Sequence, residues 1–307
     1  MLRDRHLKLR DIRFVVAVAE VGSMAKAAGE LGVTQSAVSQ VIAGLEADLG
    51  VQLFDRSRRG VTPTVYGEAL IRRGLAALDE IRTGLEEIDF LKNDGRGVIR
   101  IGCPETLAAS VLPLALETFS KQLPAVTVEV ETFTGAEAAD KLLDRSIDLV
   151  LARDGPGLNA LLNASDFQVT RLFEDKLKIV VGNTSRWAKI RHVSLEDLAD
   201  APWIVLPYGW GEGVLPEAFA AKGLPAPHIA LKTFSIHLRL HLLATGQYVT
   251  ALPQSVFRLH ADRFGLKELA LALPPLPYGV ALVTLKNRTL TRTVDQFIQS
   301  TTTIFAT

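Results

Sequence analysis

The stretch Ser23–Glu46 reads SMAKAAGELGVTQSAVSQVIAGLE and predicts two short helices joined by a tight turn. Ser23 and Thr34 can each cap a helix start, where backbone N–H groups lack partners. Gly32 lies between the helices, where a left-handed residue ends a helix at little cost. This order of cap, short helix, glycine turn and second cap predicts a helix-turn-helix.

The second helix of this pair has two different faces. Apolar residues recur at helical spacing on one of them: Val38, Val41, Ile42, Leu45 and Leu49. The opposite face carries Gln35, Ser36, Ser39 and Gln40, whose short side chains donate and accept hydrogen bonds. They suit base edges and phosphates in a major groove, although most polar helix faces are only solvated. We therefore expect Ser23, Thr34 and these four residues to contact DNA.

The segment from Phe14 to Leu70 resembles the N-terminal domain of the LysR-type transcriptional regulators. The resemblance rests on a dense set of positions: Ala27-Ala28, Leu31, Gln35-Ser36-Ala37-Val38-Ser39, Leu45-Glu46, Leu49-Gly50, Leu53-Phe54-Asp55-Arg56 and Gly67-Glu68.

Length and composition describe a multidomain globular chain. Its 307 residues exceed one ordinary core, and 48% hydrophobic with 22% charged residues is typical of soluble proteins. No apolar run approaches the length of a spanning helix, and residues 1–6 do not begin a signal peptide. The single cysteine, Cys103, excludes an intrachain disulfide and fits a reducing compartment. We expect a cytoplasmic protein without a membrane partner.

The charge balance limits how DNA could be bound. Lys plus Arg and Asp plus Glu both number 34, so the formal net charge is zero. Residues 1–73 contain eleven basic and eight acidic side chains. DNA contact must therefore rely on local positive patches, doubled by dimerisation.

A basic hairpin is predicted after Gly50. Short strand patterns occur at Val51–Phe54 and Val61–Thr64, and Asp55–Gly60 between them carries Arg56, Arg58 and Arg59. These arginines could reach phosphates or a narrow minor groove as the wing of a winged helix. The alternative is an exposed basic loop without a partner.

A long helix capped by Thr64 is predicted to run to about Leu91 or Lys92. Apolar or small residues at alternating spacings of three and four form a seam: Ile71, Gly74, Leu78, Ile81, Leu85 and Ile88. Such a seam pairs helices from two chains, or else packs on the protein's own core. We interpret it as a dimerisation helix, and the LysR resemblance implies the same.

Asn93–Gly97 is a flexible break, after which strand and helix patterns alternate. The first set is a strand at 98–102, a single helix at 107–119, a strand at 126–130, a helix at 136–143 and a strand at 147–152. The second set falls at 177–181, 195–198, 203–206, 214–221, 229–234, 236–245 and 248–252, followed by a strand at 278–285 and a helix at 293–304. This order predicts parallel sheets covered by helices.

The predicted fold class is α/β with two similar lobes behind a winged helix-turn-helix. The DNA-binding domain spans 1–66 and the linker helix 67–95. Lobe 1 spans 96–168 and 274–307, and lobe 2 spans 169–273; the resemblance implies both the return of the last strand and helix to lobe 1 and a periplasmic-binding-protein-like fold. The crossings are placed at Ala164–Val169 and Leu273–Pro277.

A small-molecule effector is expected between the lobes, beyond the carboxyl ends of the strands. The candidate contacts follow predicted strands: Glu105, Thr106, Thr134, Arg153, Tyr208, Trp210, Ser235 and Pro253. Thr106 and Ser235 stand at helix starts that could hold an anion, and Arg153 could bind a carboxylate or sulfonate. The alternatives are helix capping for the hydroxyl residues, a structural ion pair for Arg153, and surface packing for Trp210.

The second half most resembles regulators that respond to sugars or aromatic acids, through Pro202–Ile204 and Leu252–Val256. It departs from them at Gly246–Val249, where Tyr248 replaces a glycine. No catalytic motif or phosphate loop is present, and we expect neither a resident cofactor nor a metal. His237 and His241 are interpreted as a solvated helix face. Cys103 is interpreted as buried, with an oxidation sensor as the alternative.

These observations predict a ligand-responsive transcriptional regulator that is not an enzyme. A dimer would place two copies of the helix at 34–49 in successive major grooves of an interrupted two-fold-symmetric site. The resemblance further implies a homotetramer and contact with RNA polymerase. The rival interpretation is a small-molecule-binding protein or metabolic enzyme without DNA-binding activity.

Overall fold

The computed structural model describes residues 7–57, 60–134, 137–153, 165–207, 213–271 and 279–306. The chain forms two compact units, Met1–Leu91 with Leu143–Ser146, and Lys92–Leu142 with Ile147–Thr307. Each unit is described by itself.

The N-terminal unit is a winged helix-turn-helix followed by a long helix, as predicted. Its elements are α1 (Leu9–Val21), α2 (Met24–Leu31), α3 (Gln35–Leu49), β1 (Phe54–Ser57), β2 (Gly60–Pro63) and α4 (Val65–Lys92). Its core is built from α1, α2, α3 and the start of the hairpin, and Val15, Ala27, Val38 and Ile42 are fully buried in it. Gly32 has a φ of +65°, so the predicted left-handed turn between α2 and α3 is confirmed.

The hairpin begins three residues later than the prediction of a strand at Val51–Phe54. Its first strand is Phe54–Ser57, which pairs antiparallel with Gly60–Pro63. Only Phe54 of β1 is buried, and the next three residues are exposed. The apolar pair Leu53-Phe54 packs into the core, whereas the polar Asp55–Ser57 forms the strand, so apolar patterning misplaced it.

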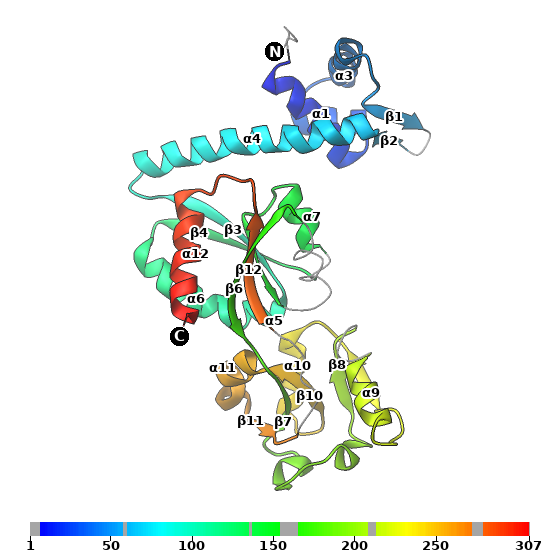
Figure 1. Cartoon of the computed structure of the whole chain (residues 1–307), viewed down its shortest axis with the longest axis vertical. Coiled ribbons are helices and arrows are strands. Elements are labelled where there is room, and N and C mark those ends of the chain that lie inside the picture. The colour runs from blue at the N-terminus through cyan, green and yellow to red at the C-terminus, as the bar shows by residue number, and fades with distance from the viewer. Residues whose placement is uncertain are drawn as a thin grey trace. The chain divides into compact units, whose positions relative to one another are not determined.

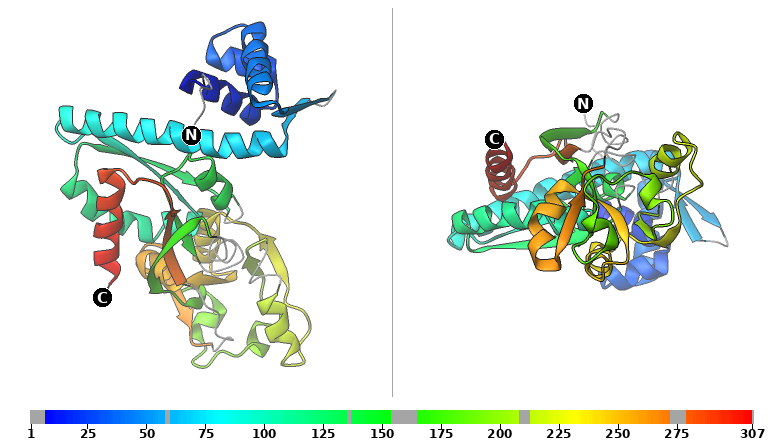
Figure 2. Two further views of the ribbon diagram at one scale, coloured as in Figure 1. Left: turned by 45° about the horizontal axis from the view of Figure 1, so that its top comes forward. Right: turned by 90° about the horizontal axis from the view of Figure 1, so that it is seen from below.

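Helix α4 is one uninterrupted helix (Figure 2). The predicted cap is confirmed, because the Thr64 hydroxyl accepts a hydrogen bond from the Gly67 amide at 3.2 Å. Gly67 lies against the Leu53 carbonyl, and Gly74 lies against Ile12 of α1. The first turns of α4 therefore pack on their own unit, while later turns expose Ile81, Leu85 and Ile88.

Lobe 1 of the second unit is a five-stranded sheet with helices on both faces (Figure 1). Its elements are β3 (Gly97–Cys103), α5 (Glu105–Ala108), α6 (Val111–Gln122), β4 (Val126–Thr132), α7 (Ala138–Leu143), β5 (Leu149–Arg153), β6 (Phe167–Glu174), β12 (Gly279–Leu285) and α12 (Arg292–Phe305). The strand order is β4-β3-β5-β12-β6, so the implied return of the last strand to lobe 1 is confirmed.

The sheet of lobe 1 is mixed, which differs from the predicted parallel sheet. Strands β3, β4 and β5 are parallel, but β12 runs antiparallel to both β5 and β6. Strand β12 is reversed because the chain re-enters lobe 1 at the end where β6 leaves it. Alternate residues along β5 point to opposite faces of the sheet. Leu149 and Leu151 pack with α6 and α12, whereas Val150 and Ala152 pack with α7.

Two further predictions for lobe 1 were wrong. The single helix expected at 107–119 is two helices, because the chain turns at Ala109 and Ser110, where the Ser110 hydroxyl donates to the Thr106 carbonyl at 2.6 Å. The stretch Ala164–Val169, expected as a crossing, contains the start of strand β6. The expected second crossing, Leu273–Pro277, lies outside the described residues.

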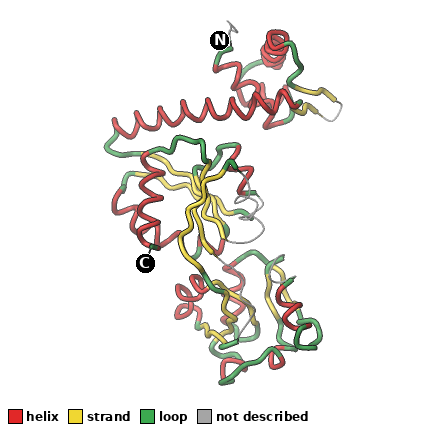
Figure 3. Tube along the Cα trace, in the orientation of Figure 1, coloured by secondary structure: helices red, strands yellow, loops and turns green. Residues whose placement is uncertain are grey.

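Lobe 2 has a second five-stranded sheet, in the order β11-β7-β10-β8-β9. Its described strands are among those drawn in yellow in Figure 3. Its elements are β7 (Leu177–Gly182), η1 (Arg186–Lys189), η2 (Glu196–Leu198), β8 (Trp203–Val205), α9 (Val214–Ala220), β9 (Ile229–Lys232), α10 (Ile236–Ala244), β10 (Val249–Pro253), α11 (Gln254–Phe264) and β11 (Leu266–Leu269). Helix α11 and strand β11 were not predicted. Trp203 and Phe219 pack edge to face in this core with ring centroids 6.2 Å apart.

Candidate DNA interface and effector cleft

The start of α3 is fixed by its own caps. The Thr34 hydroxyl accepts from the Ala37 amide at 3.3 Å and shares a hydrogen bond of 2.9 Å with the Ser36 hydroxyl. Ser23 caps α2 in the same way, accepting from the Lys26 amide at 3.4 Å. Both residues predicted to contact DNA at helix starts are therefore capping residues, a role compatible with a phosphate contact.

Helix α3 presents its predicted polar face to solvent. Val38, Ile42 and Leu45 are buried, whereas Gln35, Ser36 and Gln40 are exposed and Ser39 is half-buried. The side chains expected to read bases are thus available on the outside of the unit. Three buried apolar residues hold the inner face of α3, and Thr34 caps its first turn. The helix can therefore enter a groove as a rigid body.

Glu46 joins the recognition-helix candidate to the wing. Its carboxylate accepts from the backbone amides of Leu53 and Phe54, at 2.8 and 3.2 Å. Arg56 in the first strand of the wing lies 4.0 Å from the same carboxylate, and its side chain is about half exposed. Arg58 and Arg59, also expected to contact DNA, lie outside the described residues.

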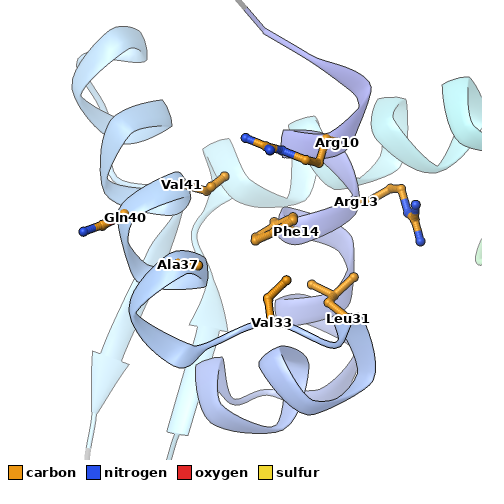
Figure 4. A pocket seen from close by; sticks show the side chains of 8 residues that line it. All are labelled: Arg10, Arg13, Phe14, Leu31, Val33, Ala37, Gln40 and Val41. Atoms are coloured by element: carbon orange, nitrogen blue, oxygen red, sulfur yellow. The ribbon is translucent and has the colours of Figure 1, made fainter.

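A pocket of about 410 Å³ opens between α1 and α3 (Figure 4). Phe14 lies in its floor, Arg10 extends toward α3, and Gln40 points away from α1. Its remaining lining residues are Arg13, Leu31, Val33, Ala37 and Val41. The sequence did not predict this pocket, which borders the polar face of α3 through Gln40.

The predicted seam of α4 divides into a packed part and an exposed part. Ile71 is half-buried against the helix-turn-helix core, and Leu78 is half-buried. Ile81, Leu85 and Ile88 have exposed fractions of 50%, 58% and 53%. Three large apolar side chains on one stripe of a helix indicate a surface that a second helix would cover.

Short helix α5 and the turn after it lie where the two lobes meet. The Glu105 carboxylate accepts from the Ile236 amide at the start of α10, at 3.0 Å. A hydrogen bond of 2.8 Å joins the Ala109 carbonyl to Nε2 of His260, and the Ser110 and Ser255 hydroxyl oxygens are in contact at 3.3 Å. Glu105, an expected effector contact, thus bridges the lobes.

A small cavity adjoins this contact. Two expected effector residues, Thr106 and Pro253, line it together with Leu177, Ile204, Val205, Leu206, Arg239, Thr250 and Ala251. Its volume is about 20 Å³, roughly enough for one water molecule. As formed by the described residues, the cavity is smaller than a molecule of several heavy atoms.

Arg239 is a cavity residue that the sequence interpretation missed. It is 2% exposed, and its guanidinium donates to the Thr250 hydroxyl at 3.1 Å and to the Ala251 carbonyl. It lies among Ile236, Leu240 and Leu243 on the buried side of α10. A charged residue at an apolar helical position was the available signal, because such a charge is costly to bury without partners.

The other expected effector residues are dispersed. Arg153 forms a buried ion pair with Asp175, at 2.8 Å, and lies 3.5 Å from the Ser255 hydroxyl. Ser235 caps α10 by accepting from the Leu238 amide. The Thr134 hydroxyl donates to the Glu137 carboxylate at 3.2 Å, and Thr134 is not among the described residues lining the cavity. Tyr208 and Trp210 lie outside the described residues.

Cys103, His237 and His241 are side chains of types that can react or bind metal. Cys103 is completely buried, and burial raises the pKa of its thiol from 9.0 to about 12. The rings of His237 and His241 lie 4.9 Å apart on the exposed side of α10. Across the described ranges, no group of three or more His, Cys, Asp or Glu side chains could hold a metal ion. No described helix is long and apolar enough to cross a membrane.

Comparison with known proteins places both units in one family. Residues 9–68 match the bacterial regulatory helix-turn-helix protein of the lysR family, and residues 92–305 match the LysR substrate binding domain. The transcriptional dual regulator GltC of Bacillus subtilis is 28% identical over 293 residues, which cover 95% of this chain and 96% of GltC. This relative is a transcriptional regulator.

Solved structures share the fold over almost the whole chain. A full-length OxyR variant from Pseudomonas aeruginosa has a TM-score of 0.67 and 20% identity, covering 97% of this chain and 95% of that one. Full-length CbnR in complex with its target DNA has a TM-score of 0.61 and 22% identity, covering 96% and 99%. The family matches and the exposed, capped α3 together show that this chain belongs to the LysR family and is a ligand-responsive, DNA-binding transcriptional regulator.

Proposed function

We propose that the chain reads DNA with α3 in the major groove and with Arg56, Arg58 and Arg59 on adjacent phosphates or in the minor groove. The observation that carries this proposal is the polar face of α3: Gln35, Ser36 and Gln40 are exposed on a helix whose opposite face is buried. Side chains of this kind form paired hydrogen bonds with base edges. The CbnR complex supports the arrangement, because that protein of the same fold was solved with its target DNA.

The experiment is a gel shift with DNA from upstream of the chain's own gene and a scrambled duplex of equal length, at two salt concentrations. Retardation of the upstream DNA that weakens steeply with salt supports the proposal, because each neutralised phosphate adds about 0.9 to the slope of log K against log salt. Absent or salt-insensitive retardation would instead support a small-molecule-binding protein or an enzyme without DNA-binding activity.

The functional unit is proposed to be a dimer, assembled into a tetramer. Residues 1–73 carry a basic excess of only three, so a single head gains little from phosphate contacts. The exposed stripe of Ile81, Leu85 and Ile88 offers a pairing surface, and paired heads predict an interrupted two-fold-symmetric DNA site. Analytical ultracentrifugation of the full chain measures the state directly.

The effector is proposed to be a small molecule held between the lobes near Thr106, Pro253 and Arg239. The cavity there is lined by polar residues, Thr106, Thr250 and Arg239, and by apolar residues that include Ile204, Val205 and Leu206. A ligand that prefers one degree of lobe closure would shift the population of the two states and thereby the DNA affinity. Thermal-shift screening of the full chain against sugars, aromatic acids and amino acids identifies its class.

The remaining assignments follow from the family. Transcription regulation is proposed to occur in the cytoplasm, through binding of DNA and contact with RNA polymerase, without enzymatic activity and without a resident cofactor. The support is the lysR-family helix-turn-helix match over residues 9–68. In vitro transcription from the upstream DNA with purified polymerase, with and without the protein, tests the regulatory step.

A further inference from the structure

The segment Glu105–Ser110 of lobe 1 contacts lobe 2 at three separate points. Glu105 accepts a hydrogen bond from the start of α10, the Ala109 carbonyl is hydrogen-bonded to His260 of α11, and the Ser110 hydroxyl lies 3.3 Å from the Ser255 hydroxyl of α11. Ala109 also packs against the apolar cluster of lobe 2 that contains Ile236, Leu240 and Val256. This segment, which we call the latch, is therefore a polar and apolar contact between the lobes.

Glu105 of lobe 1 caps one of the amides at the start of α10 in lobe 2. Helix α10 starts with amides that have no partner within the helix. Ser235 of the same lobe accepts from the Leu238 amide at 3.3 Å, whereas the Ile236 amide donates to Glu105 of lobe 1 at 3.0 Å. A carboxylate at a helix start gains both from a charge-assisted hydrogen bond and from the helix dipole.

Ser255, which Ser110 contacts, belongs to a hydrogen-bonded group with Asp175 and Arg153. The Ser255 hydroxyl donates to Asp175 Oδ2 at 2.6 Å, and the Ser255 amide donates to Asp175 Oδ1 at 3.2 Å. Asp175 follows strand β6 and is held by Arg153 in a pair whose side chains are 3% and 6% exposed. This point is buried and multiply bonded, whereas Glu105 at the other end of the latch is partly exposed, so we expect the Glu105 contact to break first and the rest of the latch to follow.

The latch also borders the effector cavity. Thr106 follows Glu105 directly and lines the cavity of about 20 Å³, whose opposite wall includes Arg239 of α10. A ligand larger than a water molecule needs more space than these residues leave, and a movement of α5 away from α10 would supply it. That movement lengthens the distance between Glu105 and Ile236, whose hydrogen bond spans the same gap.

We propose that Glu105 is an internal ligand of α10 that holds the lobes closed, and that an effector must displace its carboxylate from the Ile236 amide. The inference deepens the proposed effector response and rests on it for its biological meaning. In this role Glu105 sets the free energy that effector binding must supply to open the cleft.

Hydrogen–deuterium exchange of the full chain tests the latch without knowledge of the effector. Three variants are compared with the parent: Glu105→Ala, which removes the acceptor, Glu105→Gln, which keeps a weaker neutral one, and Ser235→Ala. The last is the matched control, because it removes a cap from the same helix end without touching lobe 1. The readouts are peptides covering 107–112, 236–240 and 254–260.

In Glu105→Ala we expect about tenfold faster exchange in all three peptides, because loss of a charge-assisted bond releases the lobe contact as a unit. Glu105→Gln should give a smaller rise in the same three places. Ser235→Ala should accelerate 236–240 alone. Acceleration confined to 236–240 in both Glu105 variants would overturn the proposal, since Glu105 would then be only a local cap.

Folding and function are separated by two further measurements. Circular dichroism and urea unfolding show whether Glu105→Ala is folded; if it is not, Glu105→Gln decides by the same three-peptide pattern. The gel shift of the parent protein tests DNA binding on its own. A parent that fails to bind DNA would refute the proposed function, and the exchange pattern would still decide whether Glu105 holds the lobes together.

Discussion

The Glu46 carboxylate of α3 accepts a hydrogen bond from the Leu53 amide at 2.8 Å. This bond fixes the start of the wing to the C-terminal part of the recognition-helix candidate. The Phe54 amide donates to the same oxygen at 3.2 Å, and both Leu53 and Phe54 are buried. One side chain therefore sets the position of the wing relative to α3. Two elements expected to contact DNA are joined through it.

Glu46→Ala should weaken both folding and DNA binding. Two buried amides lose a charged acceptor, which should lower the free energy of unfolding by about 2 kcal/mol. Urea unfolding and the gel shift measure the two effects. Asp48→Asn is the control, because Asp48 is exposed on the same helix and should change neither by more than about 0.5 kcal/mol. Equal stability of both variants and the parent would contradict the anchoring role.

Substitutions on α3 and on the wing should have different signatures. Gln35→Ala or Ser36→Ala should lower the ratio of specific to non-specific affinity, because their side chains face base edges. Arg56→Ala should weaken binding to both duplexes and reduce the salt slope by about 1, as expected for a lost phosphate contact. Titrations at several salt concentrations measure these quantities. Identical behaviour of the three variants would refute the assigned roles.

Two glycines of α4 should respond oppositely to alanine. A Cβ at Gly67 would lie 2.1 Å from the Leu53 carbonyl oxygen, so Gly67→Ala should cost about 3 kcal/mol or more in unfolding free energy. Gly84 has no atom within 4 Å of the added carbon, and Gly84→Ala should gain about 1 kcal/mol from helix propensity. Denaturant titrations of both variants test the contrast, which a shared sign of the two changes would contradict.

The exposed stripe of α4 should control assembly. Leu85→Lys places a charge among Ile81, Leu85 and Ile88, and should raise the dimer dissociation constant by at least about tenfold because a paired seam cannot solvate it. Glu87→Lys is the control on another side of the helix, where the residue is exposed. Sedimentation velocity over a concentration series distinguishes them. Unchanged assembly of Leu85→Lys would place the pairing surface elsewhere.

Cys103 should be inert while the protein is folded. Burial raises the pKa of its thiol to about 12, partly opposed by the Ala108 amide, so at pH 8 only about one thiol in ten thousand is ionised. The pKa of the thiol in the folded protein lies above the ordinary 9.0, because burial favours the protonated form. The resulting contribution to stability is fully present below pH 9 and is lost as the pH rises toward 12. Iodoacetamide labelling at pH 8 should require urea, whereas an added exposed thiol, Ser120→Cys, should react at once. Rapid labelling of Cys103 in the native protein would support an oxidation sensor instead.

The sequence by itself determined the local elements near the N-terminus. Ser23, Gly32, Thr34 and Thr64 act through their own or the next turn of backbone, so their roles as caps and turn were readable from type and spacing. The apolar period of α3 likewise predicted which of its faces is exposed. These signals are local, and tertiary packing did not override them.

Only the tertiary structure decided the relationships between distant residues. The pairing of Glu46 with Leu53, of Glu105 with Ile236 and of Arg153 with Asp175 has no signal in residue type, because each joins segments whose approach depends on the whole fold. The same holds for Gly67 and Gly74: glycine weakens a helix in general, but at these two positions α4 closely approaches Leu53 and Ile12. Strand order could predict that Thr106 and Pro253 lie at one edge of the sheets, but Arg239 reaches the cavity there from a buried helix face, and packing alone could show it.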